Sequence, residues 1–263
     1  MIAILLRVAD GDGFVELRTE AEPSETLLDI LERLRAGGSR GTGDGQGVPA
    51  YRHSCHHGSC GTCGAVVNGL ESLMCLVRVY ELAAPRPRTP GGPPVEPART
   101  PDGAVVVTVE PLRKMTVVTG VAVSPGPVTA GIPDGVGYLK RVVDGDRAAL
   151  PPDATPVGYP ALAGAGRVRL EDCIECGLCV SACPVSAPFV GPAALAAVDR
   201  ERAKRPDRSK AMLAVAAAPD GAAACDRRLA CSRVCPRAVY PGKHIQLLRN
   251  ALDARTGGTG SSG

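Results

Sequence analysis

The sequence contains no tryptophan and only two phenylalanines, and aromatic residues make up just 3% of the chain. It therefore lacks the aromatic residues on which proteins stack the bases of single-stranded nucleic acid. Positive and negative charges nearly balance, with a formal net charge of +3, so electrostatic attraction to a phosphate backbone is weak. Both observations argue against a nucleic-acid partner.

Long hydrophobic runs are missing as well. Residues 1–7 are too short an apolar stretch for a signal peptide, and no run approaches the length of a transmembrane helix. We therefore expect the eleven cysteines to be reduced and available as ligands rather than paired in disulfides. The 263 residues are enough for two modest domains, each with its own core.

The most informative cysteine pattern lies at residues 173–184. It has the form C-x2-C-x2-C-x3-C-P, with cysteines at positions Cys173, Cys176, Cys179 and Cys183. Bacterial-type ferredoxins use this run to hold a cubane iron-sulfur cluster, and its fourth cysteine binds a second cluster. The pattern therefore requires a partner run elsewhere in the chain.

The partner run ends in the same Cys-Pro pair but has Arg228 where the second cysteine belongs. Its cysteines are Cys225, Cys231 and Cys235. Crosswise pairing of the two runs assigns a [4Fe-4S] cluster to Cys173, Cys176, Cys179 and Cys235. It leaves three thiolates for the other cluster, those of Cys183, Cys225 and Cys231. A guanidinium has no lone pair to offer iron, so the second site is predicted to hold [3Fe-4S].

A third group has the plant-type spacing C-x4-C-x2-C…C, which fits a [2Fe-2S] cluster. Its members are Cys55, Cys60, Cys63 and Cys75. The glycines at 58, 61 and 64 are expected to supply positive φ angles and close backbone approach. His56 and His57 raise the alternative of a Rieske centre, in which two histidines replace two cysteines. Because four cysteines are present, we expect these histidines to be solvated loop residues.

Structural zinc is the main alternative for all of these cysteines. Ligand sets of four, four and three use every cysteine, whereas zinc leaves the Cys-Pro endings and the x4 spacing unexplained. The spacing therefore favours iron-sulfur clusters.

The residues before the first cysteine group predict the opening of a β-grasp domain. Residues 2–17 alternate apolar and polar side chains around a turn, which predicts a β-hairpin. A helix is predicted between Ser24, its N-cap, and Gly37, at its end, with Leu27, Ile30, Leu31 and Leu34 on one face.

Later segments are less regular. Residues 83–103 are rich in proline and glycine without apolar periodicity, which predicts a semi-rigid spacer. Residues 105–109 read as a strand and 117–123 as an apolar run that closes the first domain. A short helix is predicted near residues 138–143.

Each bacterial-type run should be followed by a helix. Pro192 and Pro241 stand where proline is favoured, in the first turn of a helix. The basic run at 200–210 is interrupted by acidic residues, so we expect a solvated helix face rather than a lipid-headgroup site.

Together these patterns predict an α+β chain. Residues 1–120 are expected to form a β-grasp, plant-type [2Fe-2S] ferredoxin domain. Residues 121–255 should form an α-helical, bacterial-ferredoxin-like domain that holds the [4Fe-4S] and [3Fe-4S] clusters. Residues 256–263 should be a disordered tail.

The order of these motifs resembles a known family. The plant-type group is followed by Val-x-Val-Glu-Pro-Leu at 107–112, the run at 173–183, Gly-Pro-Ala-Ala-Leu at 191–195 and the run ending in Cys235-Pro. This order is similar to that of the iron-sulfur subunit of succinate dehydrogenase and fumarate reductase, the respiratory complex II family. The likeness covers almost the whole chain, except the spacer after Ala83 and residues 124–167.

The resemblance implies an electron relay. In that family a flavoprotein subunit with covalently bound FAD interconverts succinate and fumarate. Its iron-sulfur subunit passes single electrons through [2Fe-2S], [4Fe-4S] and [3Fe-4S] clusters to quinone at membrane anchor subunits. By itself the chain should bind no succinate, and it should sit peripherally on the cytoplasmic face of the cell membrane.

Two positions depart from a common family pattern. Pro188 and Asp226 stand where many members place a tryptophan and a histidine at the quinone pocket, so the choice of quinone and the direction of reaction stay open. Two alternatives also stay open: a soluble multi-cluster ferredoxin-type carrier, or the iron-sulfur component of a related soluble reductase.

Overall fold

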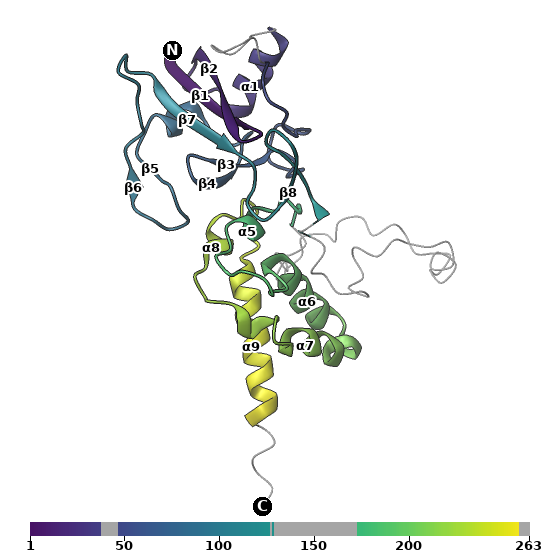
Figure 1. The fold of residues 1–263 in the computed structure, drawn as a ribbon. Coiled ribbons are helices and arrows are strands. Elements are labelled where there is room, and N and C mark those ends of the chain that lie inside the picture. Colours follow the sequence, from purple (N-terminus) through teal and green to yellow (C-terminus); the bar gives the residue numbers. More distant parts are fainter. Residues whose placement is uncertain (38–46, 127, 129–172, 258–263) are drawn as a thin grey trace, which may run out of the picture.

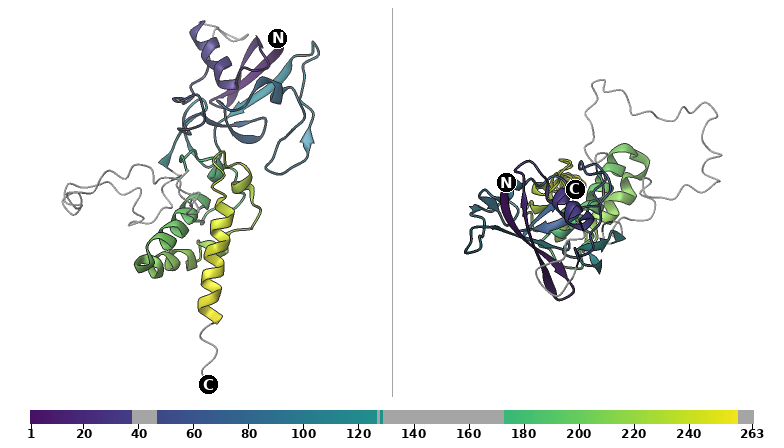
Figure 2. Two further views of the ribbon diagram at one scale, coloured as in Figure 1. Left: turned by 180° about the vertical axis from the view of Figure 1, so that it is seen from behind. Right: turned by 90° about the horizontal axis from the view of Figure 1, so that it is seen from above.

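The computed structural model describes residues 1–37, 47–126, 128 and 173–257. A sheet-containing part and a helical part are stacked along the long axis of the molecule (Figure 1). The two further views in Figure 2 show the N-terminus on the sheet and the last helix, α9, pointing away from it. The helix predicted near residues 138–143 and most of the predicted tail lie outside the described residues.

The first part is built on a five-stranded sheet with the order β2-β1-β7-β3-β4. β1 (Ile2–Asp10) and β2 (Gly13–Ala21) form the predicted antiparallel hairpin. β7 (Val105–Glu110) runs parallel to β1, and the hairpin of β3 (Gly64–Val67) and β4 (Leu70–Leu73) completes the sheet. The predicted hairpin and the predicted strand at 105–109 are therefore confirmed.

Helix α1 (Leu27–Ala36) shares one buried cluster with the sheet, and Gly37 is its C-cap as predicted. The predicted N-cap was wrong. Thr26, not Ser24, begins the helix: its hydroxyl accepts from the Asp29 N–H at 3.1 Å, and the Asp29 carboxylate accepts from the Thr26 N–H at 2.9 Å. Ser24 lies two residues too early for this reciprocal capping box.

The proline-rich segment at 83–103 has more structure than a spacer. After the short helix α2 (Val79–Leu82), strands β5 (Arg86–Pro87) and β6 (Pro94–Val95) pair in a small two-stranded sheet. Proline is tolerated on such sheet edges, which is why composition alone concealed the hairpin. Its tip meets the helical part, because a Cβ atom added to Gly91 would lie within 2.8 Å of the Arg233 side chain.

The apolar run at 117–123 is part of a further hairpin. β8 (Thr116–Thr119) pairs with β9 (Ala122–Ser124), and Val121 and Val123 belong to the same buried cluster as the main sheet.

The second part consists of helices around a smaller core. They are α5 (Leu178–Ser181), α6 (Pro192–Lys204), α7 (Ser209–Ala217), α8 (Ala230–Arg233) and α9 (Pro241–Gly257), with single 3-10 turns at Pro206–Arg208 and Ala222–Ala224. Pro192 and Pro241 start α6 and α9, as predicted. Leu195, Ile245 and Leu248 are almost completely buried between these helices. α9 extends into the first residues of the predicted tail.

The basic run at 200–210 is only in part the solvated face that we predicted: Lys204, Arg205 and Lys210 are exposed, but the start of the run is buried. Asp199, Arg200 and Glu201 are all less than 9% exposed. Arg202 binds Asp199 at 2.7 Å, and Arg208 binds Glu201 at 2.6 Å. Asp199 and Glu201 point inward and pair with arginines of the run, because a buried carboxylate requires a partner, whereas Asp207 is exposed.

A buried polar network joins the two parts. The Ser181 hydroxyl in α5 donates to the Glu71 carboxylate of β4 at 3.0 Å and accepts from the Arg113 N–H at 2.9 Å. The Arg113 guanidinium also binds Glu71 at 2.9 Å, and the Glu71 side chain is fully buried. This network holds the short cysteine-bearing helix α5 against the sheet.

Candidate metal centres

The plant-type cysteines converge although they come from separate elements. Cys55, Cys60 and Cys63 lie in the loop before β3, and Cys75 follows β4. The sulfurs of Cys63 and Cys75 are 3.3 Å apart. The Thr62 hydroxyl lies 3.1 Å from the Cys60 sulfur, a partner that the cysteine spacing did not reveal. The pairing of β3 with β4 thus closes this group.

Cys55 is prepared for the thiolate state. The N–H groups of Ser59 and Cys60 each donate to its sulfur at 3.3 Å, and hydrogen bonds, foremost from Ser59, lower the pKa of Cys55 to about 5. Burial instead raises the pKa of Cys75 to about 12, so this thiol is expected to lose its proton only when metal binds. Amide donors directed at sulfur are the arrangement that an iron-sulfur cluster requires.

Two of the three glycines in this loop behave as predicted. Gly58 and Gly61 adopt left-handed conformations, with φ of 79° and 73°. The prediction of positive φ was wrong for Gly64, which begins β3. There the requirement is space, because a Cβ atom would lie 3.2 Å from the Cys176 carbonyl oxygen.

The histidines beside Cys55 differ from one another. The His57 ring contacts the Ser59 hydroxyl at 2.9 Å, whereas His56 Nε2 lies 3.0 Å from Nδ1 of His53. His56 and His57 are both exposed loop residues, as expected, but the sequence pattern did not point to His53, the neighbour of His56, at all.

The two bacterial-type runs have the same backbone shape. In the first run, Glu175 and Gly177 have φ of 54° and 78°, and α5 follows. In the second run, Arg227 and Leu229 have φ of 57° and 58°, and α8 follows. Counted from the first cysteine of each run, the left-handed residues and the helix fall at the same positions. Arg228 therefore occupies the position equivalent to Cys176.

The first run receives its additional cysteine from the second. One cavity is lined by all four cysteines assigned to the [4Fe-4S] cluster: Cys173, Cys176, Cys179 and Cys235. Burial raises the pKa of Cys176 to about 12, and charge repulsion from Cys173 and Cys235 adds to this effect. The Val239 N–H donates to the Cys235 sulfur at 3.4 Å. The fold thus brings Cys235 to the first run.

The remaining three cysteines lie together. Burial raises the pKa of Cys231 to about 11, and repulsion from Cys183 and Cys225 contributes. The Arg227 N–H donates to the Cys225 sulfur at 3.4 Å. This grouping matches the predicted ligand set of the three-iron cluster.

Lys114 is a residue of this site that the sequence did not indicate. Its ammonium donates to the Cys183 carbonyl and, at 2.6 Å, to the Val185 carbonyl. Burial raises the pKa of Cys183, and the Lys114 charge opposes that rise. Since the two residues are far apart in the chain, only the packing of the two parts brings this charge to the site.

The plant-type loop and the first bacterial-type run touch directly. A Cβ atom added to Gly61 would lie 2.8 Å from both the Cys176 Cβ and the Ile174 carbonyl oxygen. The ligand loops of two separate cysteine groups are therefore in van der Waals contact, which places neighbouring redox centres side by side.

This contact leads to a prediction for Gly61→Ala. A left-handed alanine costs about 1 kcal/mol, and the collision with backbone at Ile174 adds about 1–3 kcal/mol. Gly103→Ala is the matched control, because Gly103 also has a positive φ, 88°, but nothing lies within 4 Å of its added Cβ. Thermal melts of the cluster-loaded chain at one scan rate should show a clearly larger fall in Tm for Gly61→Ala than for Gly103→Ala. An equal fall in Tm for the two variants would mean that the plant-type loop does not pack closely against the first bacterial-type run.

Comparison with known proteins follows the same division of the chain. A family model described as "2Fe-2S iron-sulfur cluster binding domain" matches residues 8–125, and one described as "4Fe-4S dicluster domain" matches residues 169–239. A fumarate reductase iron-sulfur subunit of Mycobacterium tuberculosis is 32% identical over 219 residues, which cover 80% of this chain and 76% of that protein. The chain belongs to the family of fumarate reductase and succinate dehydrogenase iron-sulfur subunits.

Other members of this family extend the match. The fumarate reductase iron-sulfur subunit of Wolinella succinogenes is 26% identical over 247 residues, covering 91% of this chain and 89% of that one. A chain of the Mycobacterium smegmatis Sdh1 complex in the apo form has the same fold, with a TM-score of 0.64, 21% identity and 97% coverage of both chains.

The family match confirms several predictions. The α+β fold class and the [2Fe-2S] and [4Fe-4S] clusters are confirmed, and a [3Fe-4S] cluster is consistent with the family and with the cysteine-rich C-terminal region. The chain is thus an electron-transferring subunit of an oxidoreductase complex. Within the described residues, no helix has the length and apolar character needed to span a membrane.

Proposed function

We propose that this chain carries electrons between a flavoprotein subunit with covalently bound FAD and membrane quinone, as part of a succinate:quinone oxidoreductase or a quinol:fumarate reductase. The bound clusters supply one-electron redox chemistry. The protein holds them in order, sets their ligands and directs N–H donors and charges at their sulfurs. By itself it is expected to leave succinate unchanged, because succinate conversion is assigned to the flavoprotein subunit.

The proposed ligand sets follow the cysteine groups of the fold. [2Fe-2S] is bound by Cys55, Cys60, Cys63 and Cys75. [4Fe-4S] is bound by Cys173, Cys176, Cys179 and Cys235. [3Fe-4S] is bound by Cys183, Cys225 and Cys231.

The main support for the proposal is that the three cysteine groups lie in a continuous series, in which each group is next to the following one. Gly61 of the first group packs on Cys176 of the second. The second group adjoins the third, because Cys231 of the third group lies close enough to Cys179 of the second for charge repulsion between them. This repulsion adds to burial, which is the main cause of the raised pKa of Cys179. A free carrier needs no such continuous series, whereas a relay between two partners does.

The partners are proposed to bind at opposite ends of the series. The flavoprotein lies at the [2Fe-2S] end, and anchor subunits with quinone lie at the Cys183 end, on the cytoplasmic face of the cell membrane. A hollow beside Cys183 is lined by Lys114, Pro188 and Phe189. Pro188 is exposed there, so this hollow is the candidate side for quinone.

Reconstitution tests the proposal. Anaerobically purified chain should contain about nine iron atoms, the sum for a two-, a four- and a three-iron cluster, and no FAD. Alone it should not reduce a dye or quinone with succinate, because succinate is expected to bind to the flavoprotein subunit. Adding the flavoprotein should give succinate-linked dye reduction, and adding the anchor subunits should extend this to quinone.

Two results would contradict the proposal. One is stoichiometric FAD in the isolated chain. The other is full succinate-linked electron transfer by the flavoprotein and anchor with this chain omitted. Efficient electron exchange with unrelated soluble reductases, but not with the flavoprotein, would instead favour a free ferredoxin-type carrier.

A further inference from the structure

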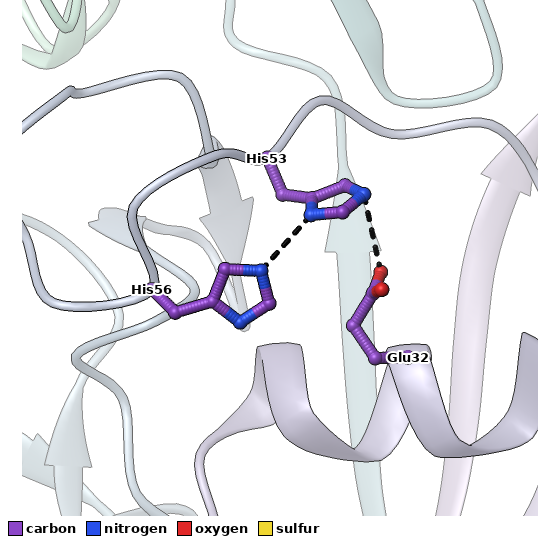
Figure 3. Close-up of side chains that lie close together, drawn as sticks. All are labelled: Glu32, His53 and His56. Carbon is purple, nitrogen blue, oxygen red and sulfur yellow. Dashed lines mark hydrogen bonds and ion pairs between the residues drawn. The ribbon is translucent and has the colours of Figure 1, made fainter.

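Beside the [2Fe-2S] loop, three side chains with metal-binding atoms point toward one another. Figure 3 shows Glu32 rising from α1 toward His53, and His53 facing His56 in the adjoining loop. Neither His53 nor Glu32 belongs to a cysteine motif, and no part of the proposed relay uses them. His56 directly follows Cys55 and lies within the loop that carries the cluster cysteines.

Two contacts place the three side chains together, and they use the two different nitrogens of His53. His53 Nε2 lies 3.4 Å from the Glu32 Oε1, and His53 Nδ1 lies 3.0 Å from His56 Nε2. One ligand atom from each of the three residues lies within 4.8 Å of the others. Zinc bonds to nitrogen and oxygen are about 2.0–2.2 Å long, so tetrahedral ligands lie about 3.3–3.6 Å apart. Since His53 can offer only one of its two nitrogens to the ion, its ring has to rotate between Glu32 and His56 to bring three donor atoms to that spacing.

Neighbouring groups restrain two of the three residues. The Tyr51 hydroxyl donates to Glu32 Oε1, and the Arg35 guanidinium lies 3.9 Å above the centre of the Tyr51 ring. His56 has a left-handed backbone with φ of 59°, a conformation that the surrounding loop must impose. The fold thus orients the Glu32 side chain and holds the His56 backbone before any ion arrives.

We propose that Glu32, His53 and His56 form a binding site for one divalent transition-metal ion of the zinc class, separate from the cysteine clusters. Two imidazoles and one carboxylate are a ligand set that zinc uses when its fourth position is open to water. Magnesium and calcium are disfavoured, because both prefer oxygen ligands and imidazole nitrogens dominate here.

Metal binding at this site should also affect the [2Fe-2S] cluster. This second inference rests on the proposed function, in which Cys55 is a ligand of that cluster. Because His56 is adjacent to Cys55, a bound dication adds positive charge beside the cluster and favours its reduced state. By linkage, the reduced protein binds the metal more tightly by the same factor. A tenfold preference equals an upward shift of about 59 mV in the one-electron potential.

The test uses the full chain with its clusters loaded. Zn²⁺ is titrated anaerobically, and X-ray absorption at the zinc edge identifies the ligands. We expect one zinc per chain, with nitrogen and oxygen ligands, a two-imidazole signature and no sulfur shell. Affinity should fall at least tenfold in His53→Ala and in His56→Asn, where asparagine tolerates the left-handed backbone.

His57→Asn is the matched control. His57 lies in the same loop but contacts Ser59 instead of the cluster of three, so this variant should bind Zn²⁺ as the parent does. If a histidine variant fails to load its [2Fe-2S] cluster, Glu32→Gln is measured in its place. The glutamine keeps an oxygen that can accept the hydrogen bond from the Tyr51 hydroxyl, but it removes the negative charge.

The proposal is overturned by an absence of saturable binding, by a zinc-sulfur shell, or by less than a tenfold effect in either histidine variant. The linked effect is tested by redox titration of the [2Fe-2S] signal with and without Zn²⁺. An upward shift that disappears in His53→Ala supports it, and an unchanged or lowered potential refutes it. These readouts need no partner subunit, so they are independent of whether the chain serves succinate oxidation.

Discussion

Arg228→Cys should convert the three-iron cluster into [4Fe-4S] and largely abolish electron delivery to quinone. Arg228 occupies the position equivalent to Cys176, because the left-handed residues on either side of it and the following helix repeat those of the first run. A cysteine at this position is therefore expected to point toward the open corner of the cluster without a change in backbone. The fourth thiolate adds negative charge, which lowers the reduction potential.

The expected loss of electron delivery to quinone is large, because the equilibrium constant for reducing the cluster depends exponentially on its reduction potential. Each 59 mV of lowering disfavours acceptance of one electron tenfold. Electron paramagnetic resonance of the oxidised variant should show loss of the three-iron signal, and iron analysis should show about one additional iron atom per chain. Quinone reduction by the assembled complex should fall much more than flavoprotein-linked dye reduction.

Arg227→Cys is the matched control. It adds the same thiol one residue away, at the position equivalent to Glu175, which is not a ligand position of the run. This variant should keep the oxidised three-iron signal and its iron content. If the parent has no three-iron signal, or if Arg228→Cys keeps that signal at full strength, then omission of a cysteine at residue 228 does not determine the third cluster.

Cys235→Ala should eliminate the [4Fe-4S] cluster and leave the three-iron cluster in place. Cys235 lines the same cavity as Cys173, Cys176 and Cys179 of the first run. Along the chain it lies 56 to 62 residues after them. Loss of an outer-shell partner of a metal typically costs about 10–100-fold in affinity or activity. Loss of a ligand in the middle of the relay should cost at least that much in electron transfer.

Cys183→Ala provides the reciprocal control. It should remove the three-iron signal and keep the reduced [4Fe-4S] signal, since Cys183 lies with Cys225 and Cys231. Both variants are measured by electron paramagnetic resonance on the isolated chain, so failure to assemble with partners does not obscure the result. The opposite outcome, with Cys235→Ala losing the three-iron signal, would show that each run binds its own cluster.

The cysteine groups could be predicted from sequence because their chemistry is local. Within one run the spacing of two or three residues determines which thiolates face one cluster, so Cys173, Cys176 and Cys179 needed no tertiary information. Helix starts at Pro192 and Pro241 and the β1–β2 hairpin are equally local, since fixed φ angles and alternation act over a few residues. Local signals also mislead when two candidates are close together, as Ser24 and Thr26 show.

Other features depended on contacts between residues that are distant in the chain. Composition suggested that 83–103 was a spacer and that Arg200 was solvated, yet the first forms a hairpin reaching Arg233 and the second is buried. In both cases packing against another element decided the outcome, and neither neighbour was visible in the local pattern.

The sequence by itself predicted which cysteines form the three groups, and it showed an arginine, Arg228, where the second run's template places a cysteine. Only the tertiary structure decided that Gly61 touches Cys176, that Lys114 reaches the third group and that α1 brings Glu32 to His53 and His56. The physical reason is the range of the interactions. Ligand spacing is set by a few adjacent backbone angles, whereas the order of the centres and the charges around them depend on how the sheet and the helices pack.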